Sequence, residues 1–302
     1  MTKITTDLVS VIVCTYNGAK YLKQQLASIC NQTYPNIEVM IVDDCSADET
    51  ISIAAEFAQK YEFVKYFVNQ ENLGVNKNMA QGFKLAKGKY ICPCDQDDVW
   101  ELNKIAVLVD LIASKNCSLV YCDAYLTDEN LNKTGFTEKD KNAFIEGFDY
   151  KNLLISNCIS GHSMLFESSL LNHVFPFPEA NILYDQWIGV AASLQKGIFY
   201  TSLPLVYFRR HDTAHTNTSR NKMEHFRHIE ATLHCLKWHS GLKVSQKKYV
   251  ENLAKCFSNQ RNTLNKFKLW FNLLTNLSSL FKIRGKGLLS NMVYSFKLAF
   301  VG

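Results

Sequence analysis

The sequence predicts an α/β protein in which a mostly parallel sheet is flanked by helices and is followed by a C-terminal helical appendage. Strand and helix patterns alternate along residues 9–122, and polar or acidic residues follow several of the strands. Residues 261–302 instead combine basic with large apolar side chains. Regular alternation implies right-handed crossovers and a parallel sheet covered on both faces. We therefore expect one large domain at residues 1–220, which carries the catalytic site, and a helical region at residues 221–302.

The first two strand–helix units are clear. An apolar, β-branched run at residues 9–14 is followed by Leu22, Leu26 and Ile29 at helical spacing. A second run at residues 37–42 precedes a Ser-x-x-Glu capping-box pattern, which predicts a helix start at residues 46–49. The same reasoning predicts strands at residues 63–68, 90–94 and 118–122 and a helix at residues 76–87 that is closed by Gly88.

Polar residues stand where these strands end. They are Thr15, Tyr16 and Asn17 after the first strand, Asp43 and Asp44 after the second, Asn72 after the third, and Asp95, Gln96, Asp97 and Asp98 after the fourth. In parallel sheets the ligand crevice lies beyond the carboxyl ends of the strands. The sequence therefore predicts a binding site at this edge.

The tetrad at residues 95–98 is the most informative stretch, because three carboxylates in four residues cannot all be buried without a cation. Asp95 and Asp97 suit a hard divalent ion such as Mg²⁺ or Mn²⁺, which commonly bridges to phosphate. The alternative is a solvated acidic turn that caps a helix beginning near Glu101. The chain has neither a Gly-x-Gly-x-x-Gly nor a Gly-Lys-Ser/Thr loop, which argues against a dinucleotide dehydrogenase and a P-loop enzyme.

Four blocks resemble, in order and spacing, the family 2 glycosyltransferases of GT-A fold, and the fourth is most similar to a bacterial rhamnosyltransferase-like subgroup. The blocks are residues 11–17, 41–48, 71–74 and 94–100, within a resemblance that covers about residues 8–218. The resemblance implies an inverting transferase that uses a nucleoside-diphosphate sugar and Mn²⁺ or Mg²⁺.

The resemblance also implies roles for individual residues. Asp44 is similar to the carboxylate that contacts the base or ribose, and Thr15 and Tyr16 would line the base pocket. Asp95 and Asp97 match the acidic motif that holds metal and sugar diphosphate. Asn17 and Asn72 complete the expected nucleotide-sugar-binding set.

Asp185 opens an apolar helix that runs to about Leu194. Its position also fits a plain N-cap. In the resembling subgroup, an Asp two positions before a Trp is the catalytic base, which matches Asp185 and Trp187. Such a base must deprotonate an acceptor hydroxyl on the face opposite the departing nucleotide.

The block at residues 206–211 resembles the segment that closes these catalytic domains. Arg209 or Arg210 offers a bidentate phosphate contact, and His211 completes the metal shell or holds the diphosphate. A lone histidine is more often a structural hydrogen-bonder. His162 follows a glycine at the position of the family's acceptor-side glycine, and we expect it to serve core packing.

Composition points to the cytoplasm, at the inner face of the cell membrane. Ten cysteines form no regular disulfide framework, which indicates a reducing compartment, and no signal peptide or long charge-free apolar run is present. Residues 261–302 hold seven Lys or Arg and no Asp or Glu, so the net charge of +5 resides in this end. That composition suits an anionic membrane surface. The alternative is a helical appendage packed on the catalytic domain or on a second subunit of a homo-oligomer.

The favoured function is transfer of a sugar to a hydroxyl of a glycan or lipid-linked acceptor in cell-surface polysaccharide synthesis. A catalytically inactive nucleotide-sugar-binding or scaffold protein of the same fold is the alternative. A nucleotidyltransferase is a third, but the Gly-rich and Lys signature expected there is missing. Nucleic-acid binding is disfavoured, because residues 1–260 are slightly acidic and contain no recognition motif.

Overall fold

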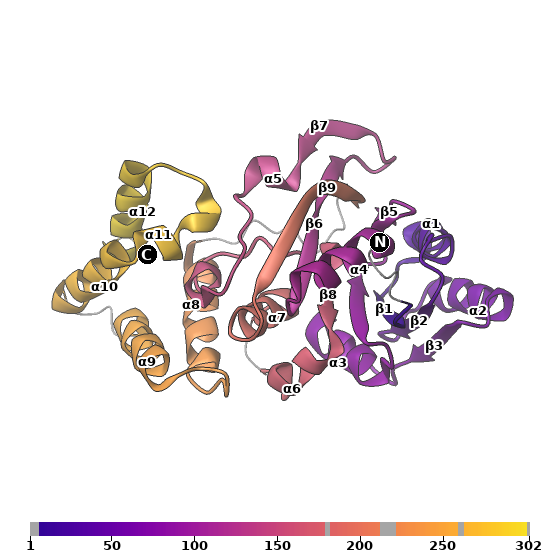
Figure 1. The fold of residues 1–302 in the computed structure, drawn as a ribbon, viewed down its shortest axis with the longest axis horizontal. Helices are drawn as coiled ribbons and strands as arrows, with labels where there is room; N and C mark the ends of the chain where they lie inside the picture. The colour runs from indigo at the N-terminus through magenta and orange to yellow at the C-terminus, as the bar shows by residue number, and fades with distance from the viewer. Residues whose placement is uncertain (1–5, 179–181, 212–221, 259–262, 301–302) are drawn as a thin grey trace.

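The computed structural model describes residues 6–178, 182–211, 222–258 and 263–300. Its centre is one nine-stranded sheet in the order β3-β2-β1-β4-β8-β6-β9-β5, with β7 paired to β6 (Figure 1). The strands are β1 (Val9–Thr15), β2 (Ile37–Asp43), β3 (Val64–Val68), β4 (Tyr90–Cys94), β5 (Val99–Trp100), β6 (Leu119–Thr127), β7 (Lys133–Thr137), β8 (Met164–Glu167) and β9 (Ile198–Arg209).

Helices cover both faces of the sheet and form the C-terminal end. Those of the first part are α1 (Ala19–Cys30), α2 (Thr50–Lys60), α3 (Val75–Leu85), α4 (Lys104–Lys115), α5 (Glu138–Lys141), α6 (Leu171–Val174) and α7 (Tyr184–Ser193), with 3₁₀ turns η1 (Tyr150–Leu153), η2 (Gly161–Ser163) and η3 (Ser168–Leu170). The C-terminal ones are α8 (Lys222–Leu236), α9 (Val244–Ser258), α10 (Thr263–Thr275), α11 (Leu277–Leu280), η5 (Lys282–Arg284) and α12 (Leu288–Phe300).

The predicted fold class is confirmed. Strands β1, β2, β3 and β4 are parallel neighbours, and β6 is parallel to β9. Strand β8 runs antiparallel between β4 and β6, and β5 and β7 are antiparallel to their partners. The register pairs Thr15 with Asp43 and Val13 with Cys94, so the residues that follow these three strands emerge at one edge.

The expected capping box at the start of α2 is wrong. The Ser46 hydroxyl donates to the Asp43 carboxylate at 2.6 Å, so it does not accept a helix N–H. Helix α2 begins at Thr50, whose N–H donates instead to the side chain of Asp48 at 3.0 Å. Asp43 competes for Ser46 because a fully buried carboxylate needs donors of its own.

Two clusters of buried side chains occupy opposite faces of the sheet. Ile12 and Met40 belong to one with α3 and α7, while Val11, Val13 and Val39 belong to the other with α1 and α4. Successive residues of a strand point to opposite faces, so these nearly continuous apolar strands are buried on both.

The first of these clusters continues into the C-terminal helices. Leu233, Leu253, Leu273 and Leu298, one from each long C-terminal helix, are buried in the same cluster as Ile12. Further links are the Lys151 ammonium bonded to the Asn276 amide oxygen at 2.9 Å and the Ala143 N–H bonded to the Ile283 carbonyl at 2.9 Å. A division into two domains at residue 220 stays a prediction. Figure 1 shows these helices gathered at the end of the molecule away from β3.

This shared interior predicts a clear stability effect. Leu273→Ala removes a fully buried side chain and should lower the free energy of unfolding by about 2–5 kcal/mol. Leu289→Ala is the matched control, because Leu289 is 77% exposed and its loss should cost less than about 0.5 kcal/mol. Denaturant unfolding of both variants checks the difference. Equal stabilities would mean that α10 is not packed as described.

No helix among the described residues combines the length and apolar character needed to cross a membrane.

Candidate active site

The polar residues that follow β1 and β2 are tied to one another. Asn17 has a positive φ of 47°, its N–H donates to the Ser46 hydroxyl at 2.9 Å, and its side-chain oxygen accepts from the Ala47 N–H at 2.9 Å. The buried Thr15 hydroxyl donates to Asp43 at 2.7 Å. Tyr16 remains 48% exposed at the rim. Thr15 and Asn17 therefore shape the floor and wall of this edge, and the Tyr16 ring is open to a ligand.

The Asp44 carboxylate is bonded to donors of its own surroundings. Its two carboxylate oxygens accept from the Asn69 side chain at 2.9 Å and from the N–H groups of Leu73 and Gly74, both at 2.8 Å. The residue is 3% exposed, so these donors compensate the buried charge. Asp44 thus holds the loop that carries the exposed Asn72. A contact of either residue with a base or ribose stays a prediction.

The acidic tetrad after β4 contacts two histidines. The Asp97 carboxylate lies 2.9 Å from Nε2 of His211, whose ring packs against Tyr21 at 4.7 Å between centroids. Asp95 and Asp98 lie 3.6 and 3.4 Å from Nδ1 of His162. The structure therefore brings the predicted pair Asp97 and His211 together and places Asp95 in a second, adjoining group.

That second group contains residues that sequence reasoning missed. His162 was expected to serve core packing. It is indeed buried and stacks on Phe208, but its ring also faces Asp95 and Asp98 and lies 3.6 Å from the carboxylate of Glu138. Asp98 is fully buried. Metal-ligating atoms of Asp95, Asp98 and His162 all lie within 4.8 Å of one another, the spacing of a metal site. A run of three acids signalled Asp98, whereas nothing local signalled His162 or Glu138.

The electrostatics of this group match a cation site. Burial raises the pKa of Asp98 well above its usual range, and the carboxylates of Asp97 and Asp95 add to the effect although His162 opposes it. Burial, and then Asp95, raise the pKa of Asp97 as well. Burial lowers the pKa of His162, but the surrounding carboxylates, Asp98 foremost, outweigh that effect and leave it raised. Carboxylates that disfavour each other's charged forms gain from a bound cation.

One buried atom also fits a divalent ion. Oδ2 of Asp98 has no hydrogen-bond partner among the described residues, and Nδ1 of His162 faces it at 3.4 Å, whereas Nε2 of His162 is turned toward Glu138. Carboxylate oxygen and imidazole nitrogen are ligands that Mn²⁺ accepts. The residues present therefore fit the metal that the resemblance implies, and the donors available are Asp95, Asp97, Asp98, His162 and His211.

Of the two arginines that were expected to offer a phosphate contact, Arg209 is bonded to the protein itself. The side chain is buried, lies over the Tyr21 ring at 4.5 Å, and donates to the carbonyls of Asp97 and Glu129 and to the side chain of Gln24. The backbone N–H of Arg209 also donates to the Asp98 carboxylate at 3.0 Å. Arg209 therefore holds the loop of residues 95–98 in place. A buried guanidinium needs hydrogen-bond acceptors, and the carbonyls of Asp97 and Glu129 provide them. Arg210 is exposed and remains the candidate for a phosphate contact.

Asp185 lies in the first turn of α7, half-buried. The adjoining Tyr184 is buried, and a side chain at Gly161 would collide with its hydroxyl. Burial raises the pKa of Tyr184, and Asp95 and then Asp185 raise it further. Asp185 thus lies beside a buried tyrosine whose pKa also responds to Asp95, and a common site for the two carboxylates stays a prediction.

Asn76 is a positioning residue that the sequence did not reveal. It lies in the first turn of α3, and its amide donates to the Ile182 carbonyl at 2.6 Å and accepts from the Tyr184 N–H at 3.1 Å. One side chain thus satisfies backbone groups just before and at the start of α7. The helix turn that carries Asp185 is fixed by this contact.

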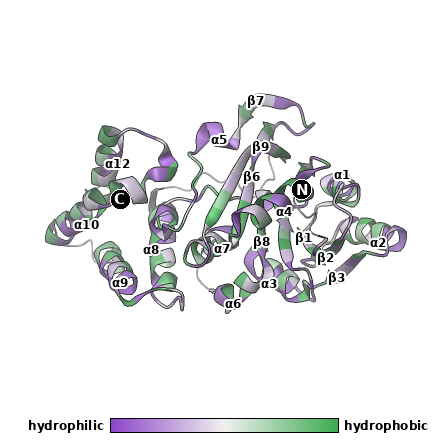
Figure 2. Cartoon of the chain, in the orientation of Figure 1, coloured by the Kyte–Doolittle hydropathy of each residue, from purple (hydrophilic) through white to green (hydrophobic). Residues whose placement is uncertain are grey.

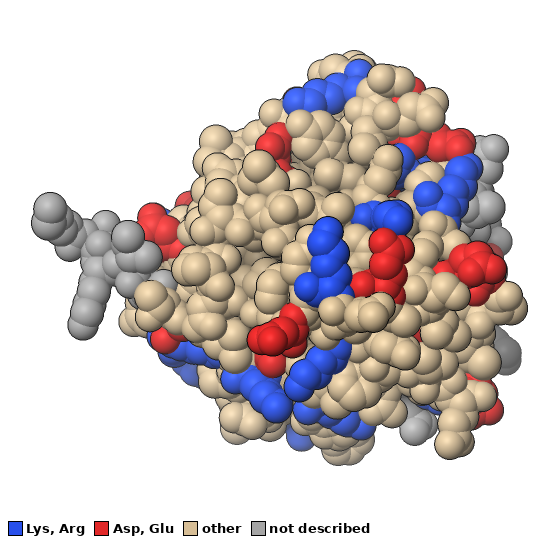
Figure 3. All heavy atoms as spheres, turned by 90° about the vertical axis from the view of Figure 1, so that its right-hand side faces the viewer, with Lys and Arg blue, Asp and Glu red and all other residues tan. Residues whose placement is uncertain are grey.

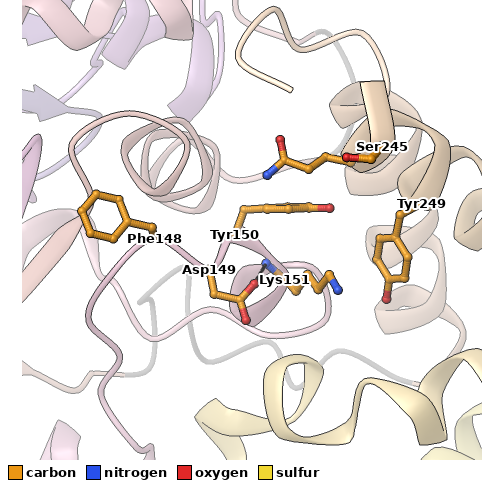
Figure 4. A pocket seen from close by; sticks show the side chains of 7 residues that line it. Phe148, Asp149, Tyr150, Lys151, Ser245 and Tyr249 are labelled. Atoms are coloured by element: carbon orange, nitrogen blue, oxygen red, sulfur yellow. Dashed lines mark hydrogen bonds between the residues drawn. The ribbon is translucent and has the colours of Figure 1, made fainter. Parts of the chain in front are cut away.

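A cavity of about 680 Å³ is lined by residues in and before η1 and by residues of α9, and by none of the residues 95–98, which mark the acidic edge of the sheet. Figure 4 shows Tyr150 of η1 directed toward Tyr249 of α9, with Phe148 on the other side and Asp149 and Lys151 below. None of these is a predicted site residue. Residues 212–217, which extend the predicted block at residues 206–211, lie outside the described residues.

Comparison with known proteins identifies the family of the chain. The model of the family "Glycosyl transferase family 2" matches residues 10–174. An uncharacterized glycosyltransferase of Rickettsia typhi is 30% identical over 227 residues, which cover 73% of this chain and 70% of that protein.

Solved structures share the fold. TarS of S. aureus, residues 1–349 in complex with UDP-GlcNAc, matches with a TM-score of 0.63 at 17% identity over 97% of this chain and 90% of that one. The mannosyltransferase PcManGT of Pyrobaculum calidifontis, in complex with GDP-Man and Mn²⁺, matches with a TM-score of 0.56 at 16% identity over 97% and 86%. With the family match and the Rickettsia relative, the acidic edge thus belongs to an enzyme that transfers sugar from a nucleotide sugar, and the chain is a member of glycosyl transferase family 2.

Proposed function

We propose that this chain is an inverting, metal-dependent hexosyltransferase that moves a sugar from a nucleoside diphosphate to a hydroxyl of a glycan or lipid-linked acceptor in cell-surface polysaccharide synthesis. Rhamnose is one candidate sugar, by the resemblance of residues 94–100 alone. The observation that supports the proposal is the group of Asp95, Asp98 and His162, with Asp97 and His211 beside it, at the carboxyl ends of the parallel strands. The UDP-GlcNAc and GDP-Man held by the two similar structures support a nucleotide-sugar donor.

In this proposal each end of the donor has its own residues. Tyr16 stacks on the base, with Thr15, Asn17, Asp44 and the exposed Asn72 shaping the pocket around base and ribose. Arg210 binds the diphosphate from solvent. Asp44 contributes by holding its loop rather than by a free carboxylate.

The leaving diphosphate meets the acidic edge. Asp95, Asp97 and His211 would hold Mn²⁺ or Mg²⁺, with Asp98 and His162 beside them, and the ion supplies positive charge for the departing nucleotide. Arg209 keeps the acidic loop in position through the Asp97 carbonyl. The presence of Mn²⁺ in the similar mannosyltransferase structure supports this choice of metal.

Asp185 serves as the base. Its carboxylate takes the proton of the acceptor hydroxyl, and the hydroxyl oxygen attacks the anomeric carbon from the opposite side as the bond to the diphosphate oxygen breaks. The electron pair of that bond leaves with the nucleoside diphosphate. A single displacement of this kind inverts the anomeric configuration and needs no covalent enzyme intermediate.

A panel of nucleotide sugars tests the proposal. The chain is incubated with each donor in Mn²⁺ and in EDTA, and release of nucleoside diphosphate is measured. We expect turnover of one donor class, dependent on the metal. A folded chain that binds a nucleotide sugar but releases no diphosphate from any donor would instead support the inactive binding protein.

Asn76 gives a further prediction about this site. Asn76→Ala removes both bonds to the start of α7, so Asp185 should lose its fixed position and turnover should fall roughly tenfold or more. The KM for the donor should stay within a few fold, because both hydrogen bonds of Asn76 go to backbone groups just before and at the start of α7. Steady-state kinetics with an unchanged melting temperature check this, and Asn76→Asp, which keeps the acceptor oxygen, should recover part of the turnover. A rise in KM alone would assign Asn76 to donor binding.

A further inference from the structure

The C-terminal helices α10 and α12 leave an apolar surface uncovered. Phe267 and Phe271 on α10 are 51% and 67% exposed, and Leu289, Val293 and Phe296 on α12 are 77%, 55% and 44% exposed. Positions three or four apart share one side of a helix, so each helix presents a stripe. Figure 2 shows hydrophobic residues along both helices.

An aromatic seam joins the two stripes into one surface. Phe267 meets Phe300 at 5.0 Å and Trp270 meets Phe296 at 5.6 Å between ring centroids, so the helices run antiparallel along the seam. We call this surface the α10–α12 face. It comprises Phe267, Trp270, Phe271, Leu289, Met292, Val293, Phe296 and Phe300.

The structure narrows what the sequence suggested for this region. Leu269, Leu273, Leu280 and Phe281 are buried against the rest of the protein and are not available to a partner. The Arg284 guanidinium bonds to Asn291 at 2.9 Å and lies 3.9 Å from the Tyr294 ring centre. The inner side of the region therefore packs on the rest of the protein, as the appendage alternative held, and its outer side is exposed.

A cationic recess shares helix α10 with the face. A cavity of about 340 Å³ between α9 and α10 is lined by Lys255 and Lys268, by Cys256, and by the side-chain amides of Asn252, Asn265 and Asn272. Both lysines are exposed, and no carboxylate lines the recess. Ammonium and amide N–H groups are donors suited to a phosphate oxygen.

We propose that the α10–α12 face adsorbs to an anionic lipid bilayer. Its apolar side chains would enter the boundary between headgroups and acyl chains, and a lipid headgroup phosphate would occupy the recess. Aromatic and aliphatic side chains beside lysines are the composition of interfacial membrane contacts. The opposite end of the molecule, where α1 and α2 lie, mixes acidic and basic side chains and has no such bias (Figure 3).

Charge favours a bilayer over a second copy of the chain. Residues 261–302 contain seven Lys or Arg and no Asp or Glu, so a symmetric dimer through this face would oppose cations to cations. A bilayer with anionic headgroups offers the opposite sign. This inference goes beyond the proposed transfer reaction and does not depend on it.

Vesicle binding of the full chain tests the proposal. The protein is sedimented with vesicles of phosphatidylglycerol and phosphatidylcholine, and with pure phosphatidylcholine vesicles, at low and high salt. We expect binding to the anionic vesicles only, weakened by salt. Absence of binding to anionic vesicles at low salt would overturn the proposal, whether or not the chain transfers sugar.

Two double variants separate the parts of the contact. Lys255→Gln with Lys268→Gln removes the recess cations and should weaken partitioning roughly 25-fold, since each cation near the surface contributes about fivefold. Phe271→Ser with Val293→Ser should also release the protein, because both side chains are exposed and serve no packing role. Truncation near Arg261 is not used, since it would strip buried leucines from the core.

Lys65→Gln with Lys115→Gln is the charge-matched control. These lysines are exposed and lie in β3 and at the end of α4, not on the C-terminal helices, so vesicle binding should be unchanged. Equal loss in the control and the recess variant would reduce the effect to net charge and overturn the assigned face. A lipid-free dimer that Phe271→Ser with Val293→Ser dissociates would show that a second copy covers the face, which also overturns the proposal.

Discussion

Asp185→Asn should lose roughly 10²-fold or more in turnover while donor binding stays within a few fold. Asparagine keeps the size of aspartate but cannot accept the proton of the acceptor hydroxyl. Asp185 is half-buried at the start of α7 and does not belong to the group around the acidic tetrad, so affinity for the nucleotide has no reason to change. Single-turnover kinetics and nucleotide titration measure the two quantities separately.

Asp149→Asn is the control for a general effect of a carboxylate at a helix start. Asp149 accepts the Lys151 N–H at the start of η1, and no transfer chemistry is assigned to it. Its variant should keep full turnover. If Asp185→Asn also turned over normally, Asp185 would be a helix cap and the base would have to be sought elsewhere.

Asp97→Asn should abolish transfer and weaken binding of the nucleoside diphosphate in Mn²⁺ far more than in EDTA. The amide preserves a hydrogen bond to His211 but withdraws the negative charge that a divalent ion requires. Because removal of one of several mutually repelling carboxylates relieves strain, the melting temperature should hold or rise. Calorimetric titration with and without metal gives the affinities.

Two further variants sharpen this test. Asp110→Asn, on the exposed side of α4, makes the same charge change away from the edge and should leave metal-dependent binding intact. Asp98→Asn should alter stability as well as binding, because Asp98 is fully buried and accepts the Arg209 N–H. Wild-type affinity that is equal in Mn²⁺ and EDTA would remove the metal from the proposal.

The parallel half of the fold was predictable because its signals are local. Apolar runs, helical spacing and the polar residues after each strand all lie within short windows, and they located β1 to β4 and α1 to α3 with small errors at the ends. The acidic tetrad was found the same way. The pairing of Asp97 with His211 was expected through the family resemblance and not through any pattern of spacing.

The remaining site residues depend on contacts between distant segments. His162 reaches the tetrad because β8 inserts antiparallel between β4 and β6, an arrangement that no short window of the sequence indicates. Asn76 reaches α7 across more than a hundred residues. Arg209 is the opposite case. Its residue type suggested a contact with phosphate, but in the structure the carbonyls of Asp97 and Glu129 accept its N–H groups.

The interior that joins the catalytic part to the C-terminal helices implies that the two share a single cooperative transition. Loss of α10 or α12 would expose leucines of the common core. Substitutions on the outer surface of these helices are then limited by the packing of the inner side. A substitution that disturbed this packing would lower the amount of folded enzyme. Disruption of the common core would consequently abolish sugar transfer together with the membrane adsorption that is proposed for the outer surface.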